Sequence, residues 1–184
     1  MPSVVVLLRG VNVGPTLRVT SADLRGAAAD AGLSPARALL NSGNLVVATG
    51  TEQRPDDVAR LVQEKLTVRL GTTVPTVGLS AERLDSITAA NPFTAAARDD
   101  PARLQVHLPF GELDTAGVAR LDLANAGREL LATAAGVLYV HYTDGIGRSK
   151  LTSKVIDTAV GGPTTARNWN TITRLRAACA TLLA

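Results

Sequence analysis

The chain contains few of the residues that stack on nucleic acid bases, form disulfides or bind metal ions. Aromatic side chains make up 3% of its 184 residues, which limits recognition of nucleic acid by base stacking. Cys179 is the only cysteine, so no disulfide framework is available and a reducing compartment is expected. His107 and His141 are the only histidines, and no cluster of cysteines or carboxylates at ligand spacing accompanies them. The sequence therefore predicts no metal site, and it points to no cofactor.

Long apolar runs are also missing. No run approaches the roughly 20 apolar residues that cross a bilayer. Residues 4–8 are apolar, but Arg9 follows at once, which is unlike a signal peptide. We expect a cytoplasmic protein with no membrane partner.

Several loop motifs of nucleotide binding and catalysis are absent. Residues 145–150 contain two glycines, an arginine and a lysine, but not at the spacing of a G-x-x-x-x-G-K-[ST] loop. The chain also has no G-x-G-x-x-G after a predicted strand and no G-x-S-x-G elbow. The activities that depend on these loops are therefore set aside.

What the chain does contain is an ordered series of strands and helices. Apolar residues make up 46% and charged residues 19%, which favours a folded core over disorder. A capping box at Thr20 and Asp23 and a proline at position 55 predict the starts of two helices. Strands are predicted at residues 4–8, 38–41, 45–48 and 74–79. The order is β-α-β-β-α-β, the ferredoxin-like unit.

The second half repeats this order. A linking helix at residues 80–90 precedes a strand at 104–108, where alternation predicts a half-exposed strand with His107 on the polar face. A hairpin turns at Ala135-Gly136, a helix covers about 149–160, and a weak strand at 164–167 precedes a final helix. The predicted fold is α+β, with two tandem ferredoxin-like (βαββαβ) units, antiparallel sheets and a C-terminal helix. The predicted domains are residues 1–80 and 81–184.

The first strand bears on assembly. Residues 4–8 do not alternate, so both faces of this strand are expected to be buried. A ferredoxin-like sheet has helices on one face only, and an apolar second face needs a cover. Either the second repeat or a second subunit could supply it, so a homodimer is one of two interpretations.

Positive charge is concentrated near the C-terminus. The chain has 19 Lys+Arg against 16 Asp+Glu, a net charge of +3. Residues 145–184 hold six basic residues and one acid, Asp157, so this segment carries +5. Such an excess favours an acidic partner, although a solvated basic helix face is the alternative.

Five polar motifs occur along the chain in a fixed order. They are LRGVNVG at residues 8–14, NSGN at 41–44, NPF at 91–93, RSKLT at 148–152 and RNWNT at 167–171. Together they resemble the DUF1697 family of bacterial proteins, over nearly the whole chain. The resemblance implies a pair of ferredoxin-like units. The family's biochemical function is not established, so the resemblance implies no catalytic residues. The chain departs from the family pattern at residues 15–17, where Pro-Thr-Leu replaces small and basic residues.

The two C-terminal motifs each precede a predicted helix. Ser149 is the expected N-cap of the first helix, and Asn168 or Asn170 that of the second, with Trp169 as a core residue. A cation beside a helix N-terminus is unfavourable by about 0.3–1 kcal/mol, and a bound anion would reverse that sign. The candidate anion-binding residues are Arg148, Ser149, Lys150, Thr152, Arg167, Asn168 and Asn170.

A second candidate group lies at strand ends of the first repeat. Its members are Arg9, Asn12, Asn41, Ser42 and Asn44. Turn geometry is the favoured explanation for these Asn and Ser residues. The alternative is a polar rim around a small ligand, with Arg9 as a carboxylate or phosphate clamp.

Three hypotheses of function follow from these patterns. The leading one is a binding protein for a phosphate-bearing or other anionic ligand, either a nucleotide or a nucleic acid. The second is a small-molecule enzyme with a polar site between the two repeats. The third is a structural or interaction module whose polar residues serve only caps and turns.

Overall fold

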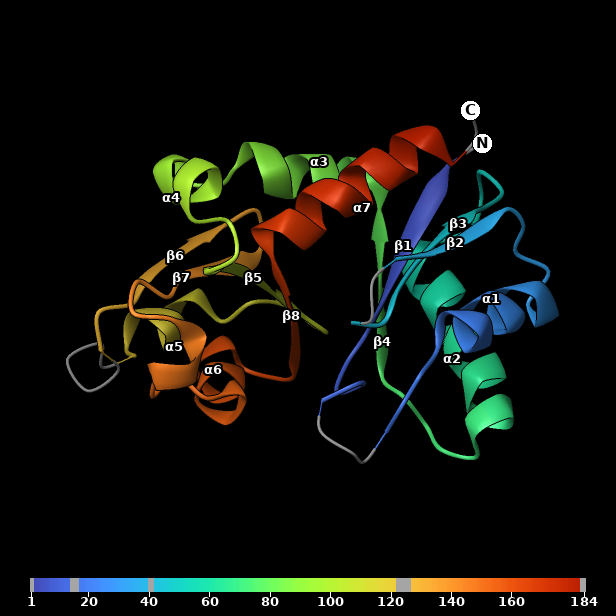
Figure 1. Ribbon diagram of the computed structural model, residues 1–184, viewed down its shortest axis with the longest axis horizontal. Coiled ribbons are helices and arrows are strands. Elements are labelled where there is room, and N and C mark those ends of the chain that lie inside the picture. Colours follow the sequence, from blue (N-terminus) through green and yellow to red (C-terminus); the bar gives the residue numbers. More distant parts are fainter. Residues whose placement is uncertain (1, 14–16, 40–41, 122–126, 183–184) are drawn as a thin grey trace. The chain divides into compact units, whose positions relative to one another are not determined.

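The chain forms two compact units, each built on one four-stranded antiparallel sheet (Figure 1). This computed structural model describes all residues except 1, 14–16, 40–41, 122–126 and 183–184. The first unit comprises residues 1–85 together with 174–184, and the second comprises residues 86–173. No helix among the described residues is long and apolar enough to span a membrane.

The first unit has the predicted βαββαβ order. Its sheet order is β2-β3-β1-β4, with every neighbouring pair antiparallel, as in a ferredoxin-like unit. The elements are β1 (Ser3–Leu8), α1 (Ser21–Asp30), β2 (Ala36–Leu39), β3 (Asn44–Ala48), α2 (Pro55–Leu70) and β4 (Thr76–Ser80).

Helices α1 and α2 begin where their sequence signals predict. The Thr20 hydroxyl accepts a hydrogen bond from the Asp23 N–H at 3.1 Å, and the Asp23 carboxylate accepts one from the Thr20 N–H at 2.8 Å. Pro55 opens α2, and Gly71 ends it in the left-handed region with φ 69°. Both helices pack on one sheet face, where Val6, Leu45 and other apolar residues form the core.

Every residue of β1 is buried, as its two-sided apolar pattern predicts. The last part of α7 (Trp169–Thr181) belongs to the first unit. There the buried Cys179 thiol is hydrogen-bonded to the Ser3 side chain of β1. Burial raises the pKa of this thiol. The chain's own C-terminal helix therefore contributes to the cover of the second face of the first sheet.

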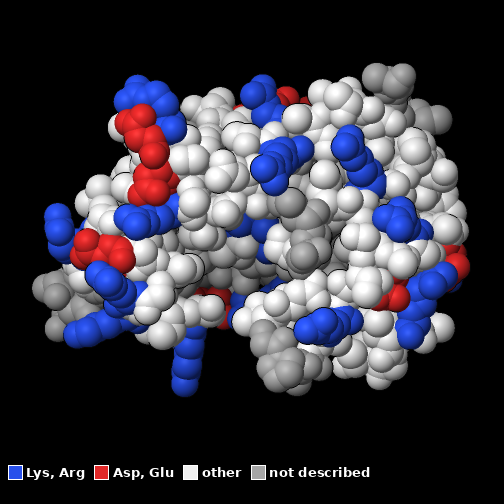
Figure 2. Space-filling model, viewed as in Figure 1, with Lys and Arg blue, Asp and Glu red and all other residues white. Residues whose placement is uncertain are grey.

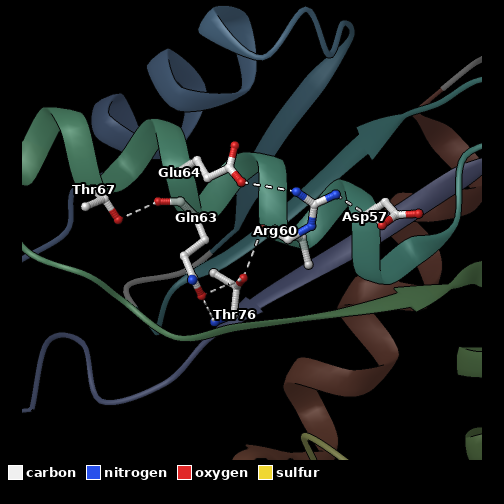
Figure 3. Close-up of polar contacts among 7 residues, drawn as sticks. Asp57, Arg60, Gln63, Glu64, Thr67 and Thr76 are labelled. Carbon is white, nitrogen blue, oxygen red and sulfur yellow. Dashed lines mark hydrogen bonds and ion pairs between the residues drawn. The ribbon is translucent and has the colours of Figure 1, made fainter.

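A polar clamp ties β4 to α2 (Figure 3). The Gln63 side-chain oxygen accepts from the Thr76 N–H at 3.1 Å, and the Thr76 hydroxyl donates to the Ala59 carbonyl at 2.9 Å. On the exposed side of α2, Arg60 lies 3.3 Å from Asp57 and 3.2 Å from Glu64. The clamp fixes the edge strand to the helix, whereas the exposed ion pairs add little stability.

The second unit repeats the order, with sheet order β6-β7-β5-β8. Two short helical elements, α4 and η2, were not predicted. The elements from the linking helix onward are α3 (Ala81–Ala89), α4 (Thr94–Asp99), β5 (Leu104–Pro109), α5 (Thr115–Ala119), β6 (Leu130–Ala134), β7 (Val137–His141), η2 (Ile146–Arg148), α6 (Ser153–Val160) and β8 (Thr164–Asn168).

Both faces of the second sheet are covered within its unit. On one face, Leu138 and Val140 pack with Ile156 and Val160 of α6. On the other face, the Tyr139 hydroxyl donates to the carbonyl of Ile87 in α3 at 2.6 Å. The two tandem ferredoxin-like units of the prediction are therefore confirmed.

The prediction of an exposed His107 is wrong. The residue is only 5% exposed, because β5 is a central strand and both faces of its sheet are covered, the face of His107 by α6. In the strand register His107 lies opposite Leu138, whose side chain packs against α6. Alternation along one strand does not show whether its more polar face is covered as well.

Candidate anion-binding site

The helix after the RSKLT motif begins later than predicted. Thr152, not Ser149, is its N-cap: the Thr152 hydroxyl accepts from the Val155 N–H at 3.3 Å. The Ser149 hydroxyl accepts instead from the Leu151 N–H at 3.0 Å, while Ser149 itself has an extended backbone. Leu151 is buried in the core of the second unit, and the Thr152 N–H bonds to the Lys150 carbonyl at 2.8 Å, so residues 149–151 form a short non-helical link before the cap.

The corrected cap gives a direct test. Thr152→Ala should destabilise the second unit by about 1 kcal/mol, because the Val155 N–H loses its acceptor. Ser153→Ala removes a neighbouring exposed hydroxyl that has no hydrogen bond to a described residue, and it should cost clearly less. Urea unfolding of the two variants, followed by the amide signals of α6, compares them. Equal losses would contradict the assignment of Thr152 as the cap.

Three cations lie within the chain segment that leads into and begins α6. Arg148, Lys150 and Lys154 are exposed, and the first turn of the helix contains no acid. None of the three side chains forms an ion pair with a described residue. Elsewhere many exposed arginines are paired, for example Arg69 with Asp30 at 2.7 Å. The positive charge of this helix end is therefore reinforced instead of balanced.

The same helix end offers backbone donors. Thr152 takes up the Val155 N–H, and the Ile156 N–H bonds to the Thr152 carbonyl. Within the described part of the chain, the N–H groups of Ser153 and Lys154 have no acceptor. Unsatisfied N–H groups of a first helical turn are the donors that bind phosphate and sulfate in proteins.

An open groove of about 470 Å³ adjoins this helix start. Its lining residues are Gly117, Arg120, Leu121, Lys154, Val155, Thr158 and Ala159, from or next to α5 and α6. The two helices approach closely where Gly117 meets the carbonyl of Ala159, and a β-carbon on Gly117 would collide with it. Arg120 contacts Asp114 at 3.4 Å, but this pair is largely exposed and weak. The groove thus combines an apolar floor with two cationic side chains, those of Arg120 and Lys154.

The second basic motif has a different environment. Arg167 lies on β8 and is only 5% exposed. Its guanidinium donates to the Thr165 hydroxyl at 2.8 Å and to the Ala166 carbonyl at 2.7 Å. Burial lowers the pKa of this guanidinium to about 10, so Arg167 remains a cation at neutral pH.

The polar residues after Arg167 serve the start of α7. The Asn168 side-chain oxygen caps the helix by accepting from the Thr171 N–H at 2.9 Å and the Thr171 hydroxyl at 2.8 Å. The Trp169 N–H donates to the Pro101 carbonyl at 3.2 Å, and its side chain is half-buried. Asn170 is exposed. Of the two predicted caps, the structure therefore uses Asn168.

The two basic motifs do not converge. Arg167 and Tyr139 both lie opposite Val106 in the strand register, so their side chains share one sheet face. Helix α6 packs on the other face, against Leu138. The candidate site therefore consists of the start of α6 and its groove, without Arg167, Asn168 or Asn170.

The polar residues of the first unit are engaged in loop structure. The Asn12 side chain bonds to both the N–H and the carbonyl of Val19, each at 3.0 Å, and Asn12 has a positive φ of 57°. Asn44 is fully buried and donates to the Leu39 carbonyl and to the Ser42 hydroxyl. Arg9 is half-buried at the end of β1. Asn41 lies outside the described residues. These bonds match the turn explanation of the motifs.

Comparison with known proteins identifies the family of this chain. A family model described as "Protein of unknown function (DUF1697)" matches residues 1–139. The chain belongs to this family. No curated protein matches the sequence.

A solved structure extends the likeness of this DUF1697 chain beyond the matched residues. The conserved bacterial protein SP0830 from Streptococcus pneumoniae has 22% sequence identity and a TM-score of 0.74, covering 98% of this chain and 99% of the other. At this identity the likeness shows the shared fold. The start of α6 and β8 lie after residue 139 and therefore outside the family match.

The sequence of this DUF1697 chain did not predict the three charged or hydroxyl-bearing residues of the groove, which are Arg120, Lys154 and Thr158. Lys154 is one of the six basic residues of the C-terminal segment, but it lies outside the polar motif at residues 148–152. The available signal was the spacing of Lys154 and Thr158, which puts both on one side of a helix. Arg120 carried no such signal, since only the packing of α5 on α6 brings it to the groove.

Proposed function

We propose that the protein binds a small phosphate-bearing ligand of about nucleotide size at the start of α6 and in the adjoining groove. Lys154 carries the proposal. It is the second residue of α6, it follows Arg148 and Lys150 closely in the chain, and it lines the groove.

Electrostatics supports a phosphate at this position. The helix end carries a partial positive charge, and each nearby cation costs about 0.3–1 kcal/mol while no anion is present. A phosphate there would accept from the N–H groups of Ser153 and Lys154, and the Lys154 ammonium could contact the same phosphate. Binding would thus turn a repulsive arrangement into an attractive one.

The groove supports a ligand with an apolar part. Its volume of about 470 Å³ falls in the range of small-molecule sites. Leu121, Val155 and Ala159 supply apolar surface, and Thr158 supplies a hydroxyl at the side of the groove. A phosphate ester with an aromatic or aliphatic body has the matching chemistry.

A small ligand is favoured over a nucleic acid. Figure 2 shows the Lys and Arg side chains of the visible face in small groups, separated by uncharged residues or lying next to acidic ones. Tight binding to a nucleic acid backbone depends on many phosphate contacts and responds steeply to salt.

We take the protein to be cytoplasmic, since a buried Cys179 without a disulfide partner suits a reducing compartment.

Titrations with inorganic phosphate, adenosine monophosphate and a short single-stranded oligonucleotide test the proposal. At low ionic strength, adenosine monophosphate should shift the amide signals of Ser153 and Lys154 and bind more tightly than inorganic phosphate. Lys154→Glu should weaken this binding at least about tenfold, because it removes a charged contact worth about 1.5–3 kcal/mol.

The matched control is Arg25→Glu. Arg25 is an exposed cation on α1 of the first unit, so its reversal changes net charge equally without touching the site. It should leave binding within about twofold of the unmodified protein. The absence of shifts at Ser153 and Lys154 with every probe would refute the proposal. Tightest binding by the oligonucleotide, with a steep salt dependence, would replace the small ligand by nucleic acid.

A further inference from the structure

The edge strand β6 has backbone groups that face away from β7, its only partner strand among the described residues. The hairpin from β6 to β7 turns through Ala135 and Gly136, both with positive φ (46° and 61°), so Ala134 and Val137 close the turn as a hydrogen-bonded pair. Hydrogen-bonded pairs alternate along an antiparallel ladder. Leu131 and Thr133 therefore point their N–H and carbonyl groups away from β7.

The pairing of β7 with β5, on its other side, gives the same alternation of hydrogen-bonded residues. The Tyr142 N–H donates to the carbonyl of Arg103 next to β5, so the even-numbered residues of β7 bond toward β5. The odd-numbered residues then bond toward β6, opposite Leu130, Ala132 and Ala134. No described residue accepts from, or donates to, the outward backbone groups of Leu131 and Thr133.

The other three edge strands are protected. At β8, the Thr164 N–H donates to Asp157 at 2.9 Å, and Arg167 donates to the Ala166 carbonyl. At β4, the Thr76 N–H donates to Gln63. At β2, Pro35 precedes the strand and the exposed Arg37 lies within it. Charges, prolines and side-chain bonds of this kind keep sheet edges from pairing.

Strand β6 lacks these protections. Its sequence, LLATA, contains neither a charge nor a proline, and Leu130 is 50% exposed. An edge strand with these features is a template for another strand. Such pairing uses backbone hydrogen bonds for affinity and side-chain fit for specificity.

We propose that β6 pairs antiparallel with β6 of a second copy of this chain, which joins two sheets into one of eight strands. A two-fold axis at Ala132 puts Leu131 opposite Thr133 of the partner and Thr133 opposite Leu131 of the partner. Both are outward-facing residues, so the two pairs exchange four backbone hydrogen bonds.

The side chains fit this register. The exposed Leu130 lies opposite Ala134 of the partner, so a large side chain meets a small one at each end of the strand. The five paired residues include no charge, since Arg128 and Glu129 lie before β6, so like charges are not opposed within the pairing. A peptide of other sequence could form the same backbone bonds, but this self-complementary order selects a second copy. The inference does not depend on the proposed ligand.

Sedimentation velocity over a range of protein concentrations tests the pairing. The unmodified chain should shift toward twice the mass of one chain as concentration rises. Thr133→Pro should remain monomeric, because it removes an outward N–H that the ladder to β7 does not use. Thr133→Val keeps that N–H and should dimerise like the unmodified chain. Circular dichroism checks that both variants fold.

Disulfide trapping tests the register without relying on the proline variant. In the proposed dimer, Ala132 faces its own copy in a non-hydrogen-bonded pair, with a Cα separation of about 4.5 Å. Ala132→Cys should cross-link under mild oxidation, whereas Ala134→Cys should not, because its copies lie about 13 Å apart. A monomer at all concentrations, dimerisation of Thr133→Pro, or preferential cross-linking at position 134 would each overturn the proposal. If the protein is monomeric, the edge of β6 would instead be available to pair with an extended segment of another protein.

Discussion

Replacing Gly78 by Ala should destabilise the first unit by about 1–3 kcal/mol. Gly78 lies on β4, where the first turn of α2 packs directly on the strand. A β-carbon there would collide with the carbonyl group of Pro55 and would lie 3.1 Å from the Asp56 nitrogen. These are backbone atoms, so no side-chain rotation can relieve the overlap, and α2 must move away from the sheet.

Gly50→Ala is the matched control for this substitution. Gly50 is exposed, and an added β-carbon would meet only the Gln53 side-chain oxygen at an ordinary 3.8 Å. Neither glycine has a positive φ, so the pair isolates the effect of space from that of backbone conformation. Urea unfolding followed by the amide signals of the first unit should show a near-neutral change for Gly50→Ala. Similar losses in both variants would mean that close packing at β4 is not the reason for Gly78.

The fold was predictable where one local pattern decides the outcome. The capping box at Thr20 and the hairpin at Ala135-Gly136 each depend on residues within a few positions of one another. Even the weak strand before the last helix was predicted, because the repeat order required a partner for β5.

The start of α6 was not predictable in the same way. Ser149, Thr152 and Ser153 are all acceptable caps by residue type. The structure uses Thr152, after a Ser149 with an extended backbone and a buried Leu151. The three hydroxyl residues alone carry no signal that selects one of them as the cap.

The candidate site has the same limitation. The motif at residues 148–152 located the basic helix start, but the groove beside it includes Arg120, which is distant in the sequence. Arg167 appeared equivalent to Arg148 as a cation before a helix. Its strand position turns it to the opposite sheet face and buries it, which only the register of β8 with β5 reveals.

Acidification should cost the second unit stability between about pH 6.5 and pH 4, because His107 is buried as a neutral imidazole. Burial lowers its pKa from 6.5 to about 4, and the Asp157 charge opposes this shift only in part. As the pH falls through this window, the unfolded chain takes up a proton that the folded chain does not, so unfolding is favoured. The loss should approach about 3 kcal/mol at pH 4, at about 1.4 kcal/mol for each pKa unit.

Removing the imidazole should flatten this part of the stability profile. In His107→Leu the Tyr142 hydroxyl, 3.4 Å from the His107 Nε2 atom, loses a neighbour, which lowers stability by an amount that does not vary with pH here. Burial raises the pKa of Tyr142 to about 12, so that hydroxyl does not titrate in the window.

Hydrogen bonds lower the pKa values of Asp23, Asp30 and Asp99 below 3.8, so these carboxylates are protonated only at lower pH. Urea unfolding of His107→Leu at several pH values, with His141→Gln as the control that keeps His107, separates the two imidazoles. An unchanged slope in His107→Leu would show that another group supplies the acid sensitivity.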